Sequence, residues 1–401
     1  MNAEAREYPL DEFSAIDGNA AAAQYLAKFW QPVALSRDYI PGTAKRIKIL
    51  GNHHTLYRGE GGQLNLVQDR CPHRGTSLAY GWVEDNCIRC RYHGWKFSGD
   101  GAGVEFPAET ATYEQRISLE SHPVREYLGV VFAYLGGGEA PDFPQYPELE
   151  DESAGELMSM SVTLPYNYFQ RVENDVDEVH IYYVHREFMA SFGLVDLPRI
   201  TAKETDYGLV CTTVRSDGSK FLTHMHMPNA FLREAAIGQD KEELAIHAAW
   251  RVPIDDVSTL SVMIDRVKNY DPKVREGEKE MIDPTEIAQQ ILAGEFTLEE
   301  ADQNHPLLPV IQDTVAMAGQ GLVADRANEN LGQSDRALGL LRRIWSRELK
   351  ALREERPLKS WHRSAGKKLP MFLAAADSEV ATGDSGGTVA AIDAGVTSGG
   401  S

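Results

Sequence analysis

The sequence predicts an α+β fold, in which a small all-β domain precedes a larger mixed domain that ends in helices. Three observations predict this order. Short β-rich segments separated by turns fill residues 33–134, a Gly- and Pro-rich stretch follows at 136–147, and helical periodicity dominates residues 295–356. The length of 401 residues suits two or three domains.

The first part of the chain, residues 1–30, is predicted to be an N-terminal arm followed by a helix. Residues 1–18 suit a mobile or surface-wrapping arm, and residues 21–30 suit a helix that ends before Pro32. The all-β domain then covers residues 31–140. Its clearest strands are expected at 46–50, 54–59, 64–69 and 129–135, with hairpin turns at Gly61-Gly62 and Asp100-Gly101.

The mixed domain is predicted to cover residues 141–370. Strands are expected near 158–168, 208–215, 220–227 and 243–251, and one helix is expected from Tyr168 to about His185. A long amphipathic helix follows Ser334, a candidate N-cap, and its basic run is interpreted as a solvated face. Residues 371–401 are rich in Ala, Gly, Ser and Thr and are predicted to be a disordered acidic tail.

Composition excludes several classes of protein. The formal net charge of −20 argues against nucleic acid or an anionic membrane as a partner. No apolar run approaches the ~20 residues that span a bilayer, and the acidic N-terminus does not resemble a signal peptide. With only four Cys residues, the sequence favours a reducing cytoplasm.

The most informative stretch pairs Cys71 and His73 with Cys90 and His93. Zinc also accepts two sulfur and two nitrogen ligands, but usually from separate Cys-Cys and His-His pairs. Here each loop mixes one Cys with one His, which suits a Rieske [2Fe–2S] cluster with two His ligands on one iron. The remaining cysteines, Cys87 and Cys211, are interpreted as free buried thiols.

A second constellation lies downstream, in the predicted helix that contains Asn174, Asp177, His180 and His185. Two imidazoles five residues apart do not share one straight helical face, but they can converge where the helix ends or bends. Two His and one carboxylate leave open positions on iron(II). The alternative is two unrelated His residues on an amphipathic helix, which the upstream cluster makes less attractive, because an electron-transfer domain requires an acceptor.

Asp177 lies three residues before His180 and therefore on the same helical face. Its carboxylate is expected to accept the imidazole N–H and fix the tautomer, or to bridge a cluster His to His180. The alternative is a surface Asp in an acidic neighbourhood.

The carboxylate ligand must come from another segment. Candidates are Asp313, Asp325, Glu329 and Asp335. Asp313 is favoured because it lies in an apolar helical setting, where an unpaired carboxylate is costly.

The two motifs, Cys71-x-His73-x16-Cys90-x2-His93 and Asn174-x2-Asp177-x2-His180-x4-His185, together resemble the Rieske non-haem iron aromatic-ring oxygenases, α subunit. The C-terminal pattern from Gln312 to Arg343 is similar to the phthalate dioxygenase-like branch. The resemblance covers roughly residues 25–365. It implies a Rieske β-domain, then a helix-grip-like catalytic domain with an antiparallel sheet. It also implies that Asp313 is the iron carboxylate, that Asp177 bridges the two centres and that Asn174 lies beside the iron.

The resemblance further implies a homotrimer, alone or as a stacked hexamer, in which one subunit's cluster serves its neighbour's iron. No dinucleotide-binding Gly motif and no plant ferredoxin Cys spacing occurs in the sequence, so flavin and NADH belong to a separate flavin/ferredoxin-type reductase. The inter-loop disulfide of respiratory Rieske proteins is missing. Its absence favours a lower potential and electrons that come from NADH.

The expected activity is that of a terminal oxygenase, which uses O2 to hydroxylate, dihydroxylate or O-demethylate a small aromatic compound. The expected compound is an aromatic acid such as a phthalate or a substituted benzoate. The alternatives are a non-catalytic Rieske electron-transfer protein and a zinc-stabilised binding module. A substrate carboxylate needs a cation, for which the candidates are Arg199, Arg215, Lys220, Arg233 and Arg251. His224 and His226 are explained by strand alternation.

Overall fold

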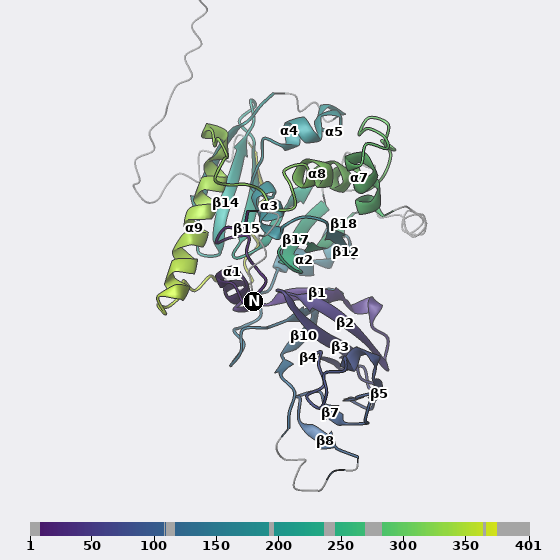
Figure 1. Cartoon of the computed structure of the whole chain (residues 1–401). Coiled ribbons are helices and arrows are strands. Elements are labelled where there is room, and N and C mark those ends of the chain that lie inside the picture. The colour runs from purple at the N-terminus through teal and green to yellow at the C-terminus, as the bar shows by residue number, and fades with distance from the viewer. Residues whose placement is uncertain are drawn as a thin grey trace, which may run out of the picture.

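The computed structural model describes residues 9–107, 109, 117–191, 196–235, 245–268, 283–363 and 366–374. The predicted disorder of the tail from residue 375 therefore lies outside the described residues. The molecule is elongated, with a smaller β-rich part below a larger part that combines a sheet with helices (Figure 1). No helix in these ranges combines the length and apolar character needed to cross a membrane.

Two small antiparallel sheets form the end of the molecule that carries the two Cys-His loops. The first sheet has the order β2-β3-β4-β9, with bounds Thr43–Ile49, Asn52–Arg58, Leu64–Gln68 and Ser121–His122. The second has the order β5-β6-β7-β8, with bounds Trp82–Glu84, Cys87–Arg89, Lys96–Ser98 and Gly103–Glu105. Both hairpin turns are where the sequence predicts them, and their positive-φ glycines, Gly62 and Gly101, explain the choice of residue.

A third small sheet joins the two parts of the molecule. It contains β1 (Gln31–Leu35), β11 (Val130–Ala133) and β10 (Val124–Tyr127), in that order. Phe132 of β11 packs edge-to-face on Trp250 of the large sheet, with ring centroids 5.5 Å apart. The side chains of β1 and β11 consequently belong to the main hydrophobic core, whereas Cys71 and Cys90 belong to a separate small core with Trp95 and Phe97.

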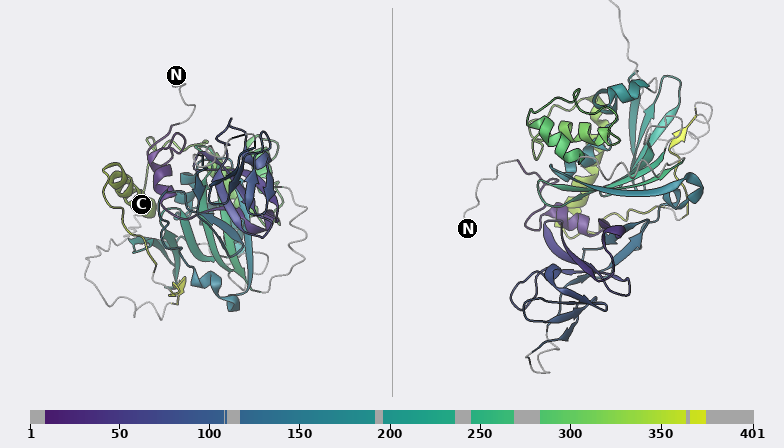
Figure 2. Two further views of the ribbon diagram at one scale, coloured as in Figure 1. Left: turned by 90° about the horizontal axis from the view of Figure 1, so that it is seen from below. Right: turned by 90° about the vertical axis from the view of Figure 1, so that its right-hand side faces the viewer.

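The larger part is built on one antiparallel sheet, which confirms the predicted α+β class (Figure 2). Its strand order is β12-β18-β17-β16-β15-β14-β13, and the bounds in that order are Glu156–Leu164, Thr259–Val267, Ala245–Pro253, Ala230–Ala235, Lys220–His226, Gly208–Val214 and Arg199–Glu204. Strands β13, β16 and β18 are additional to those predicted. A short strand β19, Phe372–Leu373, pairs with β15, so the folded chain extends beyond the predicted limit at residue 370.

The helices differ from the prediction in four places. The bounds are α1 Ala21–Ala27, α2 Pro147–Glu150, α3 Tyr168–Asn174, α4 Ile181–Val184, α5 Arg186–Ser191, α7 Pro284–Leu292, α8 Leu308–Ala318 and α9 Arg336–Arg353. Helix α1 ends at Ala27 rather than Trp30, and Pro32 lies in β1. The helix predicted from Tyr168 to His185 is broken after Asn174, and residues 295–307 are not helical.

The fourth difference concerns the start of α9. Ser334 lies inside a 3₁₀ turn, Gln333–Asp335, and the N-cap of α9 is Asp335 rather than Ser334. The Asp335 Oδ2 atom closes this turn by accepting the Gly332 N–H at 2.6 Å. The basic run of α9 is also more than a solvated face. Arg342 pairs with Glu173, and Arg347 pairs with Glu204 and Glu348.

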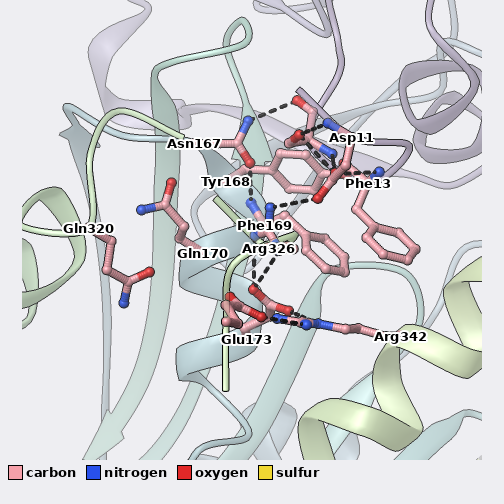
Figure 3. Close-up of polar contacts among 12 residues, drawn as sticks. Asp11, Phe13, Asn167, Tyr168, Phe169, Gln170, Glu173, Gln320, Arg326 and Arg342 are labelled. Atoms are coloured by element: carbon pink, nitrogen blue, oxygen red, sulfur yellow. Dashed lines mark hydrogen bonds and ion pairs between the residues drawn. The ribbon is translucent and has the colours of Figure 1, made fainter. Parts of the chain in front are cut away.

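The N-terminal arm wraps the surface where it is described. Phe13 stacks on Phe169 of α3 with ring centroids 4.9 Å apart, and its carbonyl accepts the Tyr168 hydroxyl at 2.6 Å. Asp11 pairs with Arg326 at 3.2 Å. Figure 3 shows these side chains converging on α3 from the arm and from the segment after α8. The arm therefore supports the helix that leads to the predicted iron ligands.

Candidate metal centres

The two Cys-His loops have the same backbone construction. The Cys71 N–H donates to Thr76 O at 2.9 Å and the Cys71 carbonyl accepts the Gly75 N–H at 2.9 Å. In the second loop, the Cys90 N–H donates to Trp95 O at 2.8 Å and the Cys90 carbonyl accepts the Gly94 N–H at 3.0 Å. Both glycines have φ near +75° (76° and 75°), a conformation that side chains disfavour. Each loop is thus closed by its own backbone before any metal binds.

The four predicted cluster ligands lie close together, and the two cysteines are more deeply buried than the two histidines. Cys71 and Cys90 are both 2% exposed, whereas His73 and His93 are half-buried, with ring centroids 4.4 Å apart. The His73 Nδ1 atom is buried without a hydrogen-bond partner. Burial raises the pKa of the Cys71 thiol to about 11, so a thiolate there requires a bound cation. These donors fit a [2Fe–2S] cluster.

Aromatic side chains surround the cluster ligands. His73 stacks on Trp95 with ring centroids 4.4 Å apart, and Tyr92 lies against His93 at 3.8 Å. The other two cysteines are free, as predicted, but Cys87 is half-buried and only Cys211 is buried. Cys87 begins the short strand β6, whose first and last side chains are partly exposed.

The break after α3 brings the second set of predicted ligands together. His180 lies just before α4, and His185 just after it, where the chain turns into α5. The Asp313 Oδ1 atom of α8 lies 3.1 Å from His185 Nε2 and 3.6 Å from His180 Nε2. The three ligand atoms fit within 4.8 Å of one another. That Oδ1 atom is buried and has no hydrogen-bond partner, so the donor set fits one divalent cation with open positions.

Both imidazoles are oriented through Nδ1, which leaves Nε2 toward the carboxylate. His185 Nδ1 donates to Gln312 Oε1 at 2.8 Å, and His180 Nδ1 donates to the backbone carbonyl of Asp177. The prediction that the Asp177 carboxylate accepts this N–H is therefore wrong. Because α3 ends at Asn174, the carboxylate turns back and accepts the backbone N–H groups of Val179 and His180, at 3.1 and 3.3 Å.

Charge around Asp313 favours its ionised form. Burial works to raise its pKa, but the Arg171 guanidinium and the two imidazoles outweigh burial and hold the pKa of Asp313 below its usual range. Arg171 lies 2.8 Å from Asp313 Oδ2. Burial lowers the pKa of His180, which keeps this ligand neutral and available.

The other candidate carboxylates lie away from this triad. Asp325 accepts the Ala327 N–H and the Asn328 side chain, and Glu329 pairs with Arg342 at 2.7 Å. Asp335 accepts the Gly332 N–H. Each one therefore has a local structural role.

The cations predicted to bind a substrate carboxylate differ in their partners. Arg251 is 1% exposed and forms a two-pronged pair with Asp175, so it is committed to the fold. Arg215 lies over the Phe221 ring at 3.7 Å, and its buried Nε atom has no partner. His224 is buried in β15 between Tyr207 and the Pro370 carbonyl, at 2.7 Å from each.

Sequence reasoning missed two residues at the triad and one beside it. Arg171 and Gln312 contact the ligands directly, and Glu173 anchors α3. Glu173 is 6% exposed and pairs with Arg326 at 2.8 Å and with Arg342 at 2.5 Å (Figure 3). The sequence carried no signal for Arg171 and Glu173 beyond a charge just before the Asn174 motif, because their burial is visible only in the structure. The position of Gln312 immediately before Asp313 was the signal for that residue.

Comparison with known proteins agrees with this geometry. Residues 29–126 match the model of the Rieske [2Fe-2S] domain. The chain is 28% identical over 357 residues to the 5,5'-dehydrodivanillate O-demethylase oxygenase subunit of Sphingobium sp. strain SYK-6, which covers 85% of this chain and 80% of that protein. It is 30% identical over 373 residues to the phenoxybenzoate dioxygenase subunit alpha of Ectopseudomonas oleovorans, which covers 85% of each.

The fold is shared with solved structures as well. NdmA of Pseudomonas putida CBB5, solved as a mutant with caffeine, superposes with a TM-score of 0.62 at 17% identity, over 83% of this chain and 94% of that one. The two Cys-His loops and the matched domain define a Rieske-type iron–sulfur protein. The chain belongs to the Rieske aromatic-ring oxygenases, as an oxygenase subunit. A phthalate 4,5-dioxygenase subunit is a further relative.

Proposed function

We propose that this terminal oxygenase component oxidises a small aromatic acid at an iron(II) ion held by His180, His185 and Asp313. The observation that carries the proposal is the convergence of two oriented Nε2 atoms on one buried, unpartnered carboxylate oxygen. Iron in this setting supplies the open positions at which dioxygen is activated. A Rieske protein that only transferred electrons would not need such a buried triad.

We place the Rieske cluster on Cys71, His73, Cys90 and His93, with the His ligands as the electron exit because they are the more exposed pair. Two electrons per turnover come from NADH through a separate flavin/ferredoxin-type reductase. Asp177 connects a cluster His to His180, and its contact with His180 is made by its backbone carbonyl. We place the protein in the cytoplasm, because low Cys use and an oxygen-sensitive cluster suit a reducing compartment.

We further propose a homotrimer, alone or stacked as a hexamer. The support is an exposed aromatic surface beside the cluster, here called the cluster rim, formed by Tyr80, Trp82, Arg91 and Tyr92. Tyr80, Trp82 and Tyr92 are 63%, 44% and 55% exposed. Arg91 bridges the rim, because its guanidinium lies 4.3 Å above the Trp82 ring and donates to Tyr80 O at 2.6 Å. Exposed aromatic groups with an Arg are typical of protein interfaces.

The substrate class rests on the relatives and on one candidate cation. Both relatives compared above are named after aromatic acids, a dehydrodivanillate and a phenoxybenzoate. Among the predicted cations, Arg215 and Arg233 each have a buried Nε atom without a partner, and they lie over the rings of Phe221 and Phe231 at 3.7 and 5.5 Å. Arg215 is preferred because it also contacts Tyr182, which lies between His180 and His185. We assign it to the substrate carboxylate. One relative is an O-demethylase and the other a dioxygenase, so demethylation and hydroxylation both belong in the test.

The test compares His180→Ala with His362→Ala, an exposed His. The wild-type chain, its reductase and NADH are screened with phthalates, phenoxybenzoates and methoxybenzoates for coupled O2 consumption and oxidised product. His180→Ala should keep the visible spectrum of the reducible cluster, lose about one iron per chain and lose all product, while His362→Ala behaves as wild type. Product formation by His180→Ala would move the iron site elsewhere. A wild-type chain whose cluster is reduced but which forms no product from any of these substrates would be a non-catalytic electron carrier.

A further inference from the structure

One guanidinium group contacts both Asp313 and Asn174. Arg171 of α3 donates from Nη1 to Asp313 Oδ2 at 2.8 Å and also donates to Asn174 Oδ1. The Arg171 side chain is 13% exposed and the Asp313 side chain 8%. This contact links the helix that begins the histidine motif to the helix that supplies the carboxylate.

The two oxygens of Asp313 therefore have different surroundings. Oδ1 lies near both imidazole Nε2 atoms and has no hydrogen-bond partner, whereas Oδ2 is held by Arg171. The space beside them is nearly closed, since the adjoining cavity measures about 10 Å³, room for one water at most. A carboxylate that is free to rotate can chelate a metal through both oxygens. A charge-assisted hydrogen bond to Oδ2 opposes that rotation.

Asn174 is oriented by the same contact. A guanidinium group has donors only, so the atom that it contacts must be the amide oxygen. The Asn174 Nδ2 group then points away from Arg171, and it is buried without a partner. It is left as an unused donor at the site.

We propose that Arg171 is a positioning residue that restricts Asp313 to one-oxygen coordination and so keeps a coordination position open for dioxygen. The inference rests on the proposed iron site. On this proposal, Arg171 sets the number of open coordination positions on the iron without being an iron ligand itself. It also explains why the Arg171 guanidinium is buried behind Asp313, the proposed iron ligand. Repulsion between the two positive charges would by itself disfavour a cation there.

The test measures iron content and nitric oxide binding in the anaerobic full chain. Nitric oxide takes an open position on iron(II) and gives an EPR-active complex, while the oxidised [2Fe–2S] cluster is EPR-silent because its two ferric ions are coupled. Arg171→Met should retain its mononuclear iron but bind nitric oxide roughly tenfold more weakly, with an altered EPR line shape. Arg171→Lys keeps a cation on Oδ2 and should recover the wild-type affinity. Arg171→Gln repeats the test if the Met variant does not fold: its shorter, uncharged side chain loses the charge-assisted hydrogen bond to Oδ2 and should also bind nitric oxide more weakly than the wild type.

The matched control is Arg251→Met, which removes a more deeply buried Arg–Asp pair that does not include Asp313. It should bind nitric oxide as the wild type does. Unchanged affinity and line shape in Arg171→Met and Arg171→Gln would overturn the proposal. So would an equal loss in Arg251→Met, or loss of the iron itself from the Arg171 variants. If the wild-type chain bound no mononuclear iron, the proposed function would fail instead.

Discussion

Gln312 and His185 are 127 residues apart in the sequence, yet the Gln312 side-chain oxygen accepts the His185 Nδ1–H at 2.8 Å. The bond fixes the tautomer in which Nε2 is free to bind a metal. Gln312 also precedes Asp313 in α8, so one turn of helix both supplies the carboxylate and orients a histidine on another segment.

We expect Gln312→Leu to lower the affinity for mononuclear iron by about 10–100-fold, the usual effect of losing such a partner. The Rieske spectrum should not change, because the cluster ligands are in another core. Iron titration of the metal-depleted variant measures the effect. Gln320→Leu is the control, since Gln320 is exposed beyond the end of α8. Wild-type iron affinity in Gln312→Leu would show that His185 needs no partner.

Glu173 holds two arginines from the C-terminal part of the chain. Glu173→Gln breaks pairs with Arg326 and Arg342 that are largely buried. Removing one partner of a buried pair leaves charge uncompensated, and we expect a loss of about 3 kcal/mol in unfolding free energy. Urea unfolding measures it. Glu354→Gln breaks the exposed pairs with Lys350 and Arg356 and should leave the unfolding midpoint unchanged. Equal midpoints for both variants would contradict the prediction.

His54 makes the Rieske part sensitive to acid. Burial, with His122 adding to it, lowers the pKa of His54 from 6.5 to about 4. Between these two values the unfolded chain binds more protons than the folded chain, so stability falls as the pH falls. His54 alone should remove about 2 kcal/mol between pH 7.5 and pH 5.

His54→Leu should therefore lose less stability than the wild type over that range, measured as the change in urea midpoint between the two pH values. His53→Leu tests an exposed neighbour in the same strand and should keep nearly all of the acid sensitivity. A wild-type pH dependence in His54→Leu would mean that other groups dominate the acid response.

Trp82 reports on the proposed homotrimer. We expect Trp82→Ala to weaken subunit association by at least tenfold, because it removes the ring that Arg91 covers at the centre of the cluster rim. Light scattering after size exclusion, across a range of protein concentrations, measures the change. Leu292→Ala is the control, since Leu292 is 43% exposed and Trp82 44%. A trimer of undiminished stability in Trp82→Ala would exclude this surface from the interface.

The sequence was most informative where the chemistry is local. The positions of Cys71, His73, Cys90 and His93 were predictable because each loop is a short segment closed by its own backbone bonds. Asp313 could be preferred among four acids because its neighbours are apolar, and the structure brings it to the two histidines. The antiparallel sheet followed from family resemblance rather than from strand periodicity.

Long-range contacts were not predictable in this way. In the sequence, Arg171 is indistinguishable from an ordinary helical residue. Its partner Asp313 lies 142 residues later in the chain, and only the fold brings α8 beside it. Asp177 misled the prediction, because an unbroken helix would have aimed its carboxylate at His180, whereas the break after Asn174 presents the backbone carbonyl instead. Ser334 had the right chemistry for a cap, but the turn before α9 uses Asp335.

The division of the apolar side chains into two cores has a consequence for how the molecule melts. Strands β1 and β11 belong by sequence to the Rieske segment but pack in the core of the large sheet, as do Ile49, Leu56 and Leu66 of β2, β3 and β4. Cys71 and Cys90 lie in the small core. The cooperative unit that depends on the cluster is therefore smaller than the sequence domain. Calorimetry of cluster-depleted protein should show an early transition of the two Cys-His loops and the β5-β6-β7-β8 sheet, with β1, β11 and the β2-β3-β4 strands unfolding later together with the catalytic part.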